Sequence, residues 1–344
     1  MLDVVVIGAG KWATECWVPL LASLDGLYTV RAVADRRPGA ARALAHLLDL
    51  RQSDAFTELS DALHHAPAAR AGIVLTSPHQ HAPCIVQLAE RGLHVLTEKP
   101  LTTSADTAQT VWRAVHDAGV KLAVVQNYRY EARVQALRQV LRSGELGELN
   151  YLVVRLAADY RQPGSWDVGE VHTMDDPLLV EGVVHHLDMV RYLTGRDVDT
   201  VAALTRNPAW SSFAGACVGA FLLRLDGGAF ALYEANLITA GVEDRWHREY
   251  YRAECQNGSA VCAGSTVTVH RGREASELLV APQDQLSGHR RIAVGFAEWV
   301  VAGGPPVETH LDDNLASAAT VFASQRAAAT NQTVPVPRLG PGVS

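Results

Sequence analysis

The feature that most constrains this chain is a glycine-rich turn close to its N-terminus. The β-branched run at residues 4–7 leads directly into Gly8-Ala9-Gly10-Lys11-Trp12-Ala13, and a helical spacing of apolar residues follows. The first glycine permits a tight turn, the second lets a pyrophosphate approach the backbone, and the helix N-terminus attracts its charge. A strand, this turn and a helix in that order predict a dinucleotide-binding unit. The predicted cofactor contacts in the turn are Gly8, Gly10, Lys11, Trp12 and Ala13.

A second predicted strand, at residues 28–34, ends in Asp35. An acidic residue at this position hydrogen-bonds the ribose hydroxyls of NAD and repels a 2′-phosphate. Arg36 and Arg37 follow at once, however, and guanidinium groups are good partners for phosphate. We therefore expect NAD as the cofactor, with contacts from Asp35 and Arg36, and keep NADP as the alternative.

The rest of the N-terminal part alternates strand-like and helix-like segments. Apolar runs bounded by turn residues predict strands at residues 72–76, 93–97 and 121–126. Helical spacing predicts helices between them, and the alternation is typical of a doubly wound parallel sheet. The sequence thus predicts an α/β fold with an NAD(P)-binding Rossmann domain over residues 1–122.

The pattern changes after about residue 127. Alternating or apolar runs predict strands at residues 149–157, 198–205, 216–225, 229–237, 249–254, 259–263 and 267–270. The turns Asp226-Gly227-Gly228 and Gln256-Asn257-Gly258 predict hairpins. Residues 123–344 are therefore predicted to form a second α/β domain with a mostly antiparallel sheet.

Composition excludes several classes of function. With 48% hydrophobic and 19% charged residues, the chain has a globular composition. A net charge of −7 argues against nucleic acid or an anionic membrane as a partner. The five cysteines lack zinc-ligand or CxxC spacing, and no apolar run reaches about 18 residues. Because Met1 leads straight into a strand-like run, we expect no signal peptide. We expect a cytoplasmic protein with reduced thiols.

The predicted strand at residues 93–97 ends in Glu98-Lys99-Pro100. Ligands of open α/β sheets bind at the carboxyl ends of the strands, so a lysine at this point can meet a substrate. The alternative interpretation is a solvated lysine at an ordinary strand exit.

The segment at residues 176–194 combines acidic residues with a histidine. Asp176 and Pro177 predict the start of a helix that continues to about residue 194. In such a helix, Glu181, His185 and Asp188 share one face. A carboxylate beside an imidazole fixes its tautomer and raises its basicity, which suits proton exchange near neutral pH. A structural ion pair is the alternative, and because no third ligand accompanies Glu181 and His185, we predict no metal.

Together these segments resemble the glucose–fructose oxidoreductase, inositol dehydrogenase and rhizopine-catabolism (Gfo/Idh/MocA) oxidoreductases. The resemblance covers nearly the whole chain. It implies a Rossmann domain followed by a domain with an open, mostly antiparallel sheet that binds the substrate and mediates oligomerisation into homodimers or homotetramers. The motifs that carry it are Gly8-x-Gly10-x-x-Ala13, Thr76-x-Pro78-x-x-His81, Glu98-Lys99-Pro100, Asn127-Tyr128-Arg129-Tyr130 and Glu181-x-x-x-His185-x-x-Asp188.

The resemblance also implies roles for individual residues. Lys99 corresponds to the lysine that contacts the reacting oxygen, and His185 to the histidine that exchanges the proton. Glu181 stands where the family usually has Asp, and we group it with them as catalytic. Arg129 is a candidate substrate contact because of its motif. Tyr160 and Trp166 are further candidates only because they lie in the loop before the predicted helix, and ordinary loop or core residues are the alternative interpretation. The residues that correspond to cofactor-lining positions are Thr76, Ser77, Pro78, His81, Glu98, Lys99 and Asn127.

The function predicted from sequence is NAD(P)-dependent interconversion of a secondary alcohol and a ketone on a sugar, cyclitol or related polyol. Lys99 and His185 are expected to converge on the same substrate oxygen. A dinucleotide-binding sensor without catalysis is one alternative, although it would need neither residue. A glycosidase that retains NAD and uses a transient oxidation is the other.

Overall fold

The computed structural model describes residues 1–166, 171–241, 243–280 and 283–342. The chain forms two compact units. The first comprises Met1–Asn127, Gln285–Leu315 and Leu339–Ser344, and the second comprises Tyr128–Asp284 and Ala316–Arg338. The predicted single boundary after residue 122 therefore needs correction, because a C-terminal segment returns to the first unit.

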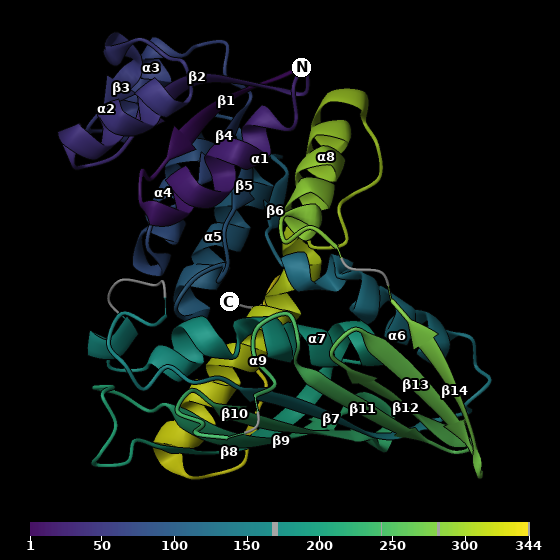
Figure 1. Ribbon diagram of the computed structural model, residues 1–344. Coiled ribbons are helices and arrows are strands. Elements are labelled where there is room, and N and C mark those ends of the chain that lie inside the picture. The colour runs from purple at the N-terminus through teal and green to yellow at the C-terminus, as the bar shows by residue number, and fades with distance from the viewer. Residues whose placement is uncertain (167–170, 242, 281–282, 343–344) are drawn as a thin grey trace. The chain divides into compact units, whose positions relative to one another are not determined.

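The first unit is built on a six-stranded parallel sheet with the order β3-β2-β1-β4-β5-β6 (Figure 1). This order reverses direction between β1 and β4, which is the switch point where doubly wound folds bind nucleotides. The predicted Rossmann topology is confirmed. The strands are β1 (Leu2–Ile7), β2 (Tyr28–Ala34), β3 (Ala55–Phe56), β4 (Ala71–Val74), β5 (His94–Thr97) and β6 (Leu122–Val124).

Helices connect these strands. The helical segment that follows Gly10 contains a π-turn, η1, before the α-helical α1, and this irregularity was not predicted. The Ser104 side chain accepts a hydrogen bond from the backbone N–H of Thr107 and so caps α5. The helical segments are η1 (Ala13–Trp17), α1 (Val18–Ala22), α2 (Pro38–Leu47), η2 (Gln52–Asp54), α3 (Leu59–His65), α4 (Pro78–Glu90) and α5 (Ala105–Asp117).

Helix α8 (Ser287–Ala302) belongs to this first unit although it lies far along the chain. The Tyr28 hydroxyl donates to the Ala293 carbonyl at 2.6 Å, and the Arg70 guanidinium donates to the Val300 carbonyl at 3.2 Å. These contacts join α8 to the amino-terminal ends of β2 and β4, which explains the corrected boundary.

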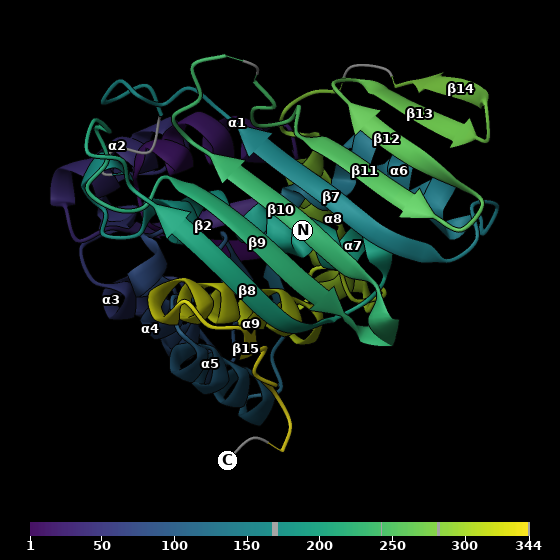
Figure 2. The ribbon, with the colours of Figure 1, turned by 90° about the horizontal axis from the view of Figure 1, so that it is seen from below.

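The second unit contains a nine-stranded sheet with the order β14-β13-β12-β11-β7-β10-β9-β8-β15 (Figure 2). All its neighbours pair antiparallel except β7 and β10, and both predicted hairpins are present. The edge strand β14 was not predicted. The strands are β7 (Leu149–Ala157), β8 (Val198–Arg206), β9 (Val218–Leu225), β10 (Phe230–Asn236), β11 (Tyr250–Cys255), β12 (Gly258–Ala263), β13 (Thr266–Arg271), β14 (Glu274–Leu279) and β15 (Val334–Pro335).

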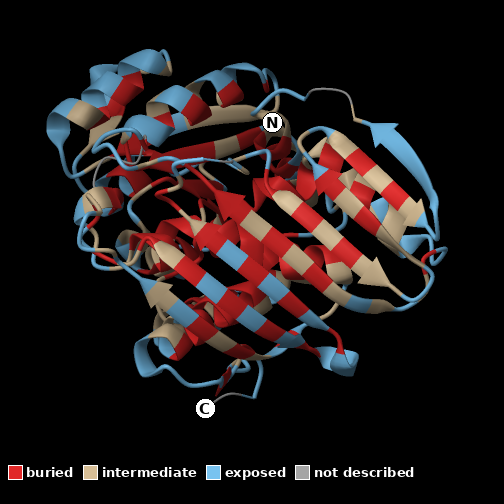
Figure 3. Cartoon of the chain, turned by 60° about the horizontal axis from the view of Figure 1, so that its bottom comes forward, coloured by how far each residue is buried: buried red, intermediate tan, exposed pale blue. Residues whose placement is uncertain are grey.

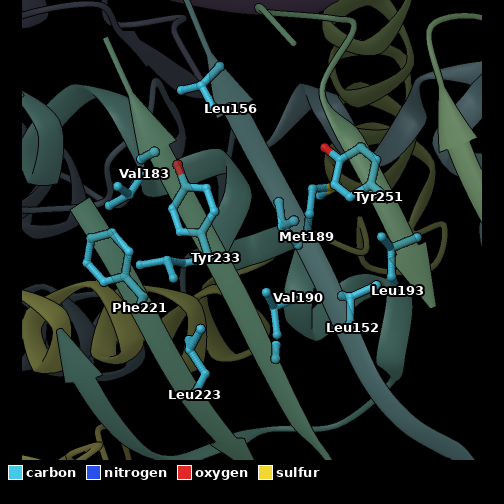
Figure 4. Close-up of a cluster of buried hydrophobic side chains, with 14 of the residues drawn as sticks. Leu152, Leu156, Val183, Met189, Val190, Leu193, Phe221, Leu223, Tyr233 and Tyr251 are labelled. Carbon is cyan, nitrogen blue, oxygen red and sulfur yellow. The ribbon is translucent and has the colours of Figure 1, made fainter. Parts of the chain in front are cut away.

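Burial alternates along β8, β9 and β10, so one face of this sheet is covered and the other is open (Figure 3). The covered face packs on helix α7 (Val184–Thr194) and the turn before it (Figure 4). That core includes Leu152, Leu156, Val183, Met189, Val190, Leu193, Phe221, Leu223, Tyr233 and Tyr251.

The predicted continuous helix from Asp176 is interrupted. Residues Leu178–Gly182 form a π-turn, η5, in which the Val183 N–H donates to the Leu178 carbonyl five residues earlier. Helix α7 then begins at Val184 and ends at Thr194, and Gly195, with a φ of 66°, provides the left-handed cap. The prediction that one regular helix carries Glu181 and His185 is therefore wrong. The remaining helical segments are η3 (Asn127–Tyr130), α6 (Ala132–Arg142), η4 (Val171–Thr173), η6 (Asp226–Gly228) and α9 (Leu311–Thr330).

Candidate functional site

The predicted cofactor residues of the first unit follow the carboxyl ends of neighbouring strands. The Leu75 N–H donates to the Ile7 carbonyl at 2.7 Å, and the Glu98 N–H donates to the Val74 carbonyl at 3.0 Å. The loops after β1, β4 and β5 are thereby held side by side at one edge of the sheet. This edge is where open parallel sheets bind nucleotides.

The two glycines of the turn have different surroundings. Gly8 has φ +97°, and a Cβ there would lie 2.7 Å from the Leu75 carbonyl carbon. A Cβ on Gly10 would meet nothing within 4 Å, so the backbone at Gly10 faces open space at the start of a helical segment. A phosphate can approach such a backbone closely, and the local structure therefore fits a bound dinucleotide. Beside it, Lys11 is exposed, 3.8 Å from Glu15, and Ala13 is buried.

Asp35 follows β2 and is held by two partners. Its Oδ2 accepts the Ala9 N–H at 2.7 Å, and Arg37 donates to both carboxylate oxygens at 3.0 Å. Burial alone would raise the pKa of Asp35, but the hydrogen bonds from Arg37 and Ala9 outweigh it and lower that pKa. The carboxylate is therefore ionised and fixed beside the glycine-rich turn. Arg36, the other predicted contact, is exposed.

Glu98 is the most constrained of the predicted cofactor residues. Its Oε1 accepts the indole N–H of Trp12 and that of Trp17, each at 2.8 Å. The His289 imidazole of α8 lies 3.8 Å from the same oxygen and contacts the half-exposed Trp12 ring at a centroid distance of 5.6 Å. Glu98 thus links the turn after β1 to the loop after β5. The roles of Trp17 and His289 were not predicted, because no pattern in the neighbouring sequence indicates that either residue contacts Glu98.

Lys99 is half-buried directly after this fixed carboxylate, and a cis peptide joins it to Pro100. The buried His81, on α4, contacts the backbone of this loop and of the loop after β4. Its Nδ1 is 2.6 Å from the Pro100 carbonyl and its Nε2 is 3.0 Å from the Thr76 carbonyl. In this structure His81 therefore connects the loops after β4 and β5, and its predicted contact with the cofactor stays a prediction.

The remaining predicted cofactor residues of this unit vary in exposure. Ser77 is exposed, Thr76 is half-buried, and Pro78 begins α4. Asn127 is buried against the first turn of α8, where a Cβ on Gly288 would lie 2.3 Å from the Asn127 carbonyl oxygen.

In the second unit, Glu181 and His185 are both buried, on the π-turn η5 and in the first turn of α7 respectively. The His185 ring stacks on Tyr128, with 4.2 Å between ring centroids and 7° between planes. Tyr128 lies within the recognised Asn127-Tyr128-Arg129-Tyr130 motif, but its partner could not be identified from the motif alone.

The Asp188 carboxylate of α7 pairs with a cation from η3 and a hydroxyl from α9. Its Oδ2 accepts from Arg129 Nε at 2.7 Å, and its Oδ1 accepts from the Ser317 hydroxyl at 2.6 Å. Arg129 is itself buried in this pair. The structure thus gives Arg129 a contact inside the unit, and its predicted contact with a substrate stays a prediction.

The other two predicted substrate contacts belong to an aromatic cluster. Tyr160 stacks on Trp166 at a centroid distance of 4.9 Å, and Trp166 contacts Trp246 at 5.6 Å. Trp246 in turn stacks on His186, the neighbour of His185 in the sequence. The cluster thus extends from the loop before η5 to helix α7.

A buried charged network lies beside these rings. Arg133 pairs with Glu249, and the His186 imidazole lies 3.4 Å from Glu249 and 2.7 Å from the Tyr233 hydroxyl. Burial would raise the pKa of Glu249, but the charge of Arg133 and the hydrogen bond with His186 lower it. Glu249 is therefore a buried anion with partners on two other elements.

Within the described parts of the chain, no group of three or more His, Cys, Asp or Glu residues could hold a metal ion. Among the same residues, no helix is long and apolar enough to span a membrane.

Comparisons with known proteins give the family. Residues 2–126 match the model of the Gfo/Idh/MocA oxidoreductase family with its NAD-binding Rossmann fold, and residues 134–261 match the C-terminal domain of the same family. The chain belongs to this family. The predicted resemblance and the predicted NAD cofactor are both confirmed.

Individual proteins are also similar to this chain in sequence or in fold. An uncharacterized protein, y4oX, from Sinorhizobium fredii is 28% identical over 97% of this chain and 95% of its own length. An inositol 2-dehydrogenase from Corynebacterium glutamicum is 30% identical, but the match spans 62% of this chain and 59% of that protein. The crystal structure of an Agrobacterium radiobacter oxidoreductase, in complex with NAD⁺, L-tartaric acid and magnesium, has a TM-score of 0.87 at 20% identity, covering 97% of this chain and 98% of the other.

Proposed function

We propose that this family member is an NAD-dependent dehydrogenase or ketoreductase. It interconverts a secondary alcohol and a ketone on a sugar, cyclitol or related polyol. The observation that carries the proposal is the placement of Lys99 directly after Glu98, which two indole N–H groups fix at the carboxyl edge of the NAD-binding sheet. The partial match to an inositol 2-dehydrogenase supports a polyol as the substrate class.

When bound, the nicotinamide ring supplies the hydride chemistry, and the residues of this chain manage binding and the proton. The open backbone at Gly10 and the ionised Asp35 would hold the dinucleotide at the pyrophosphate and the ribose. The ammonium of Lys99 hydrogen-bonds the reacting oxygen and stabilises negative charge as it develops there.

His185 acts as the general base during oxidation: it takes the proton of the substrate hydroxyl, and it returns that proton during reduction. Glu181, four residues earlier and also buried, is proposed to assist it or to bind a neighbouring hydroxyl. Tyr160, Trp166 and Arg129 complete the proposed substrate-binding residues, the first two through the aromatic cluster.

A substrate panel tests this function. The protein is incubated with NAD and a set of polyols that includes myo-inositol, and in the reverse direction with NADH and keto-sugars, while NADH absorbance is recorded. We expect turnover with at least one cyclic polyol. Tight NAD binding without turnover on any member would instead support a sensor. Cleavage of a glycoside without net NADH formation would support a redox-assisted glycosidase.

We also propose that two or four copies assemble through the open face of the nine-stranded sheet. Its exposed side chains include Leu204 on β8, Leu222 on β9 and Leu232 on β10. Leu222 and Leu232 are paired in register on neighbouring strands, and Leu204 lies two residues along β8 from Ala202, the partner of Leu222, so the three leucines form an apolar patch. Exposed patches of this kind mark interfaces between proteins.

A further inference from the structure

The His185 imidazole lies flat against an aromatic ring. Tyr128, in η3, places its ring centroid 4.2 Å from that of His185, with only 7° between the planes. Both side chains are buried, at 4% exposure for Tyr128 and 7% for His185. A parallel stack of this kind restricts rotation of the imidazole about its side-chain bonds, because tilting the ring would bring it into collision with its neighbour.

Tyr128 is itself fixed by further rings. Trp246 and His186 meet it edge-on, at centroid distances of 6.5 Å and 6.2 Å, and His247 contacts it at 4.8 Å. These contacts come from helix α7 and from the loop before β11, so the phenol ring is held by segments far apart in the sequence. A ring confined in this way can act as a rigid support.

The His247 contact is fixed by two acids. Its Nδ1 lies 2.6 Å from Glu131 Oε1, and its backbone N–H donates to Glu249 Oε1 at 3.0 Å. His247 adopts φ 66°, a left-handed conformation that non-glycine residues rarely take unless the surroundings impose it. The Glu249 carboxylate is buried and also pairs with Arg133. The hydrogen bonds with Glu131 and Glu249 thus hold His247 in this conformation, next to the Tyr128 ring.

We propose that Tyr128 is a positioning residue for proton transfer, and that its ring face sets the plane of the His185 imidazole. The inference rests on the proposed role of His185 as the general base. A general base must reach its proton within hydrogen-bond distance and in the correct orientation, and small misplacements reduce turnover strongly. Tyr128 acts through His185 without itself touching the substrate, and the aromatic ring rather than the hydroxyl supplies the support.

The variants Tyr128→Phe and Tyr128→Leu separate the ring from the rest of the side chain. Phenylalanine keeps the stacking face, and leucine removes it. Phe221→Leu is the matched control, because Phe221 is an equally buried ring of the same unit that stacks on Tyr233. Circular dichroism and thermal unfolding select the variants that remain folded at the assay temperature.

The first readout needs neither substrate nor cofactor. Histidine side chains are labelled with ¹³C, and the His185 signals are assigned by their loss in His185→Asn. In the wild type, we expect the Tyr128 ring current to shift the His185 ring protons upfield, because the two rings stack. We expect this shift to persist in Tyr128→Phe and Phe221→Leu and to be lost in Tyr128→Leu. An unchanged His185 shift in Tyr128→Leu would overturn the inference.

The second readout is turnover, measured as a double-mutant cycle with His185→Ala. We expect Tyr128→Leu to lower kcat about tenfold in the wild-type background and to have no further effect in the His185→Ala background. Tyr128→Phe should restore most of the loss. An equal loss in both backgrounds, or wild-type kcat in a folded Tyr128→Leu, overturns the inference and leaves the proposed function intact. Full turnover of His185→Ala overturns the proposed function, and the inference with it.

Discussion

Arg129 and Asp188 form a buried ion pair that ties η3 to helix α7 in the second unit. Arg129 Nε lies 2.7 Å from Asp188 Oδ2 and Nη2 lies 2.5 Å from Oδ1, while Ser317 of α9 donates to Oδ1 at 2.6 Å. Their side chains are 3% and 0% exposed. The pair holds the segment that carries Tyr128 against the helix that carries His185. The backbones on both sides of the Tyr128–His185 stack are therefore tied together.

Removing one partner of this pair should destabilise the second unit strongly. Arg129→Met leaves the Asp188 carboxylate buried without its cation, a change that typically costs about 3–5 kcal/mol. We expect a lower midpoint of urea unfolding, followed by tryptophan fluorescence. Arg161→Ala is the control, because Arg161 pairs with Asp159 at an exposed position and its loss should leave the midpoint unchanged. Equal midpoints for Arg129→Met and the wild type would contradict this assignment.

Asp176 should make stability depend on pH. Burial, with a contribution from Asp175, raises its pKa to about 6 in spite of a hydrogen bond from the Leu179 N–H. The folded protein therefore binds more protons than the unfolded chain between about pH 4 and about pH 6, so this group lowers stability as pH rises through that window.

Asp176→Asn removes the charge and keeps an oxygen that can cap the following turn. We expect this variant to unfold at higher urea concentration than the wild type at pH 8, with the difference shrinking toward pH 4. A difference of the same size at both pH values would show that the carboxylate is not the cause.

Asp35 should decide between NAD and NADP. Its carboxylate is held beside Ala9, and its lowered pKa keeps it ionised throughout the neutral range. We expect Asp35→Ala to weaken NAD binding by about tenfold or more and to improve NADP binding relative to NAD, since the repulsion of the 2′-phosphate is lost and Arg36 and Arg37 remain.

Fluorescence titration of the two cofactors measures this change. Asp3→Ala is the control, because Asp3 is also an acid paired with an arginine, Arg31, but lies at the start of β1, away from the carboxyl ends of the strands. An unchanged ratio of NAD to NADP affinity in Asp35→Ala would contradict the role of the carboxylate.

The open sheet face should control assembly. Leu222→Glu combined with Leu232→Glu places charges in the centre of the apolar patch, and we expect the oligomer to dissociate into monomers. Light scattering after size-exclusion chromatography measures the mass. Leu47→Glu, on helix α2 of the first unit, is a control at similar exposure. A wild type that is already monomeric would contradict the proposed interface.

Local patterns in the sequence were sufficient for most of the fold. The glycine-rich turn, the strand patterns and the two hairpin turns each depend on neighbouring residues, and all are present. The edge strand β14 was not predicted. All its residues are exposed, and its sequence therefore lacks the alternation of apolar and polar residues that marks a half-buried strand. The π-turn at Leu178–Gly182 was also missed, since its apolar residues fit an α-helix equally well.

The site was only partly predictable, because local motifs indicate its reactive residues but not their distant partners. Lys99 and His185 could be selected because they lie in recognisable motifs. The partners that fix their surroundings are distant in the sequence: Trp17 for Glu98, and Arg129 for Asp188. The spacing predicted only that Asp188 shares a helix face with His185, and the pairing of the Asp188 carboxylate with Arg129 depends on tertiary packing.

The most direct test of the central claim compares chemistry with cofactor binding in His185→Asn and Lys99→Met. With the polyol that gives turnover, we predict that kcat of His185→Asn falls by about 10²–10⁴-fold, because proton transfer loses its base. Lys99→Met should lose turnover as well, and the Kd for NAD should stay close to the wild-type value in His185→Asn. Wild-type kcat in His185→Asn, or a loss of turnover explained entirely by weaker NAD binding, would contradict the account.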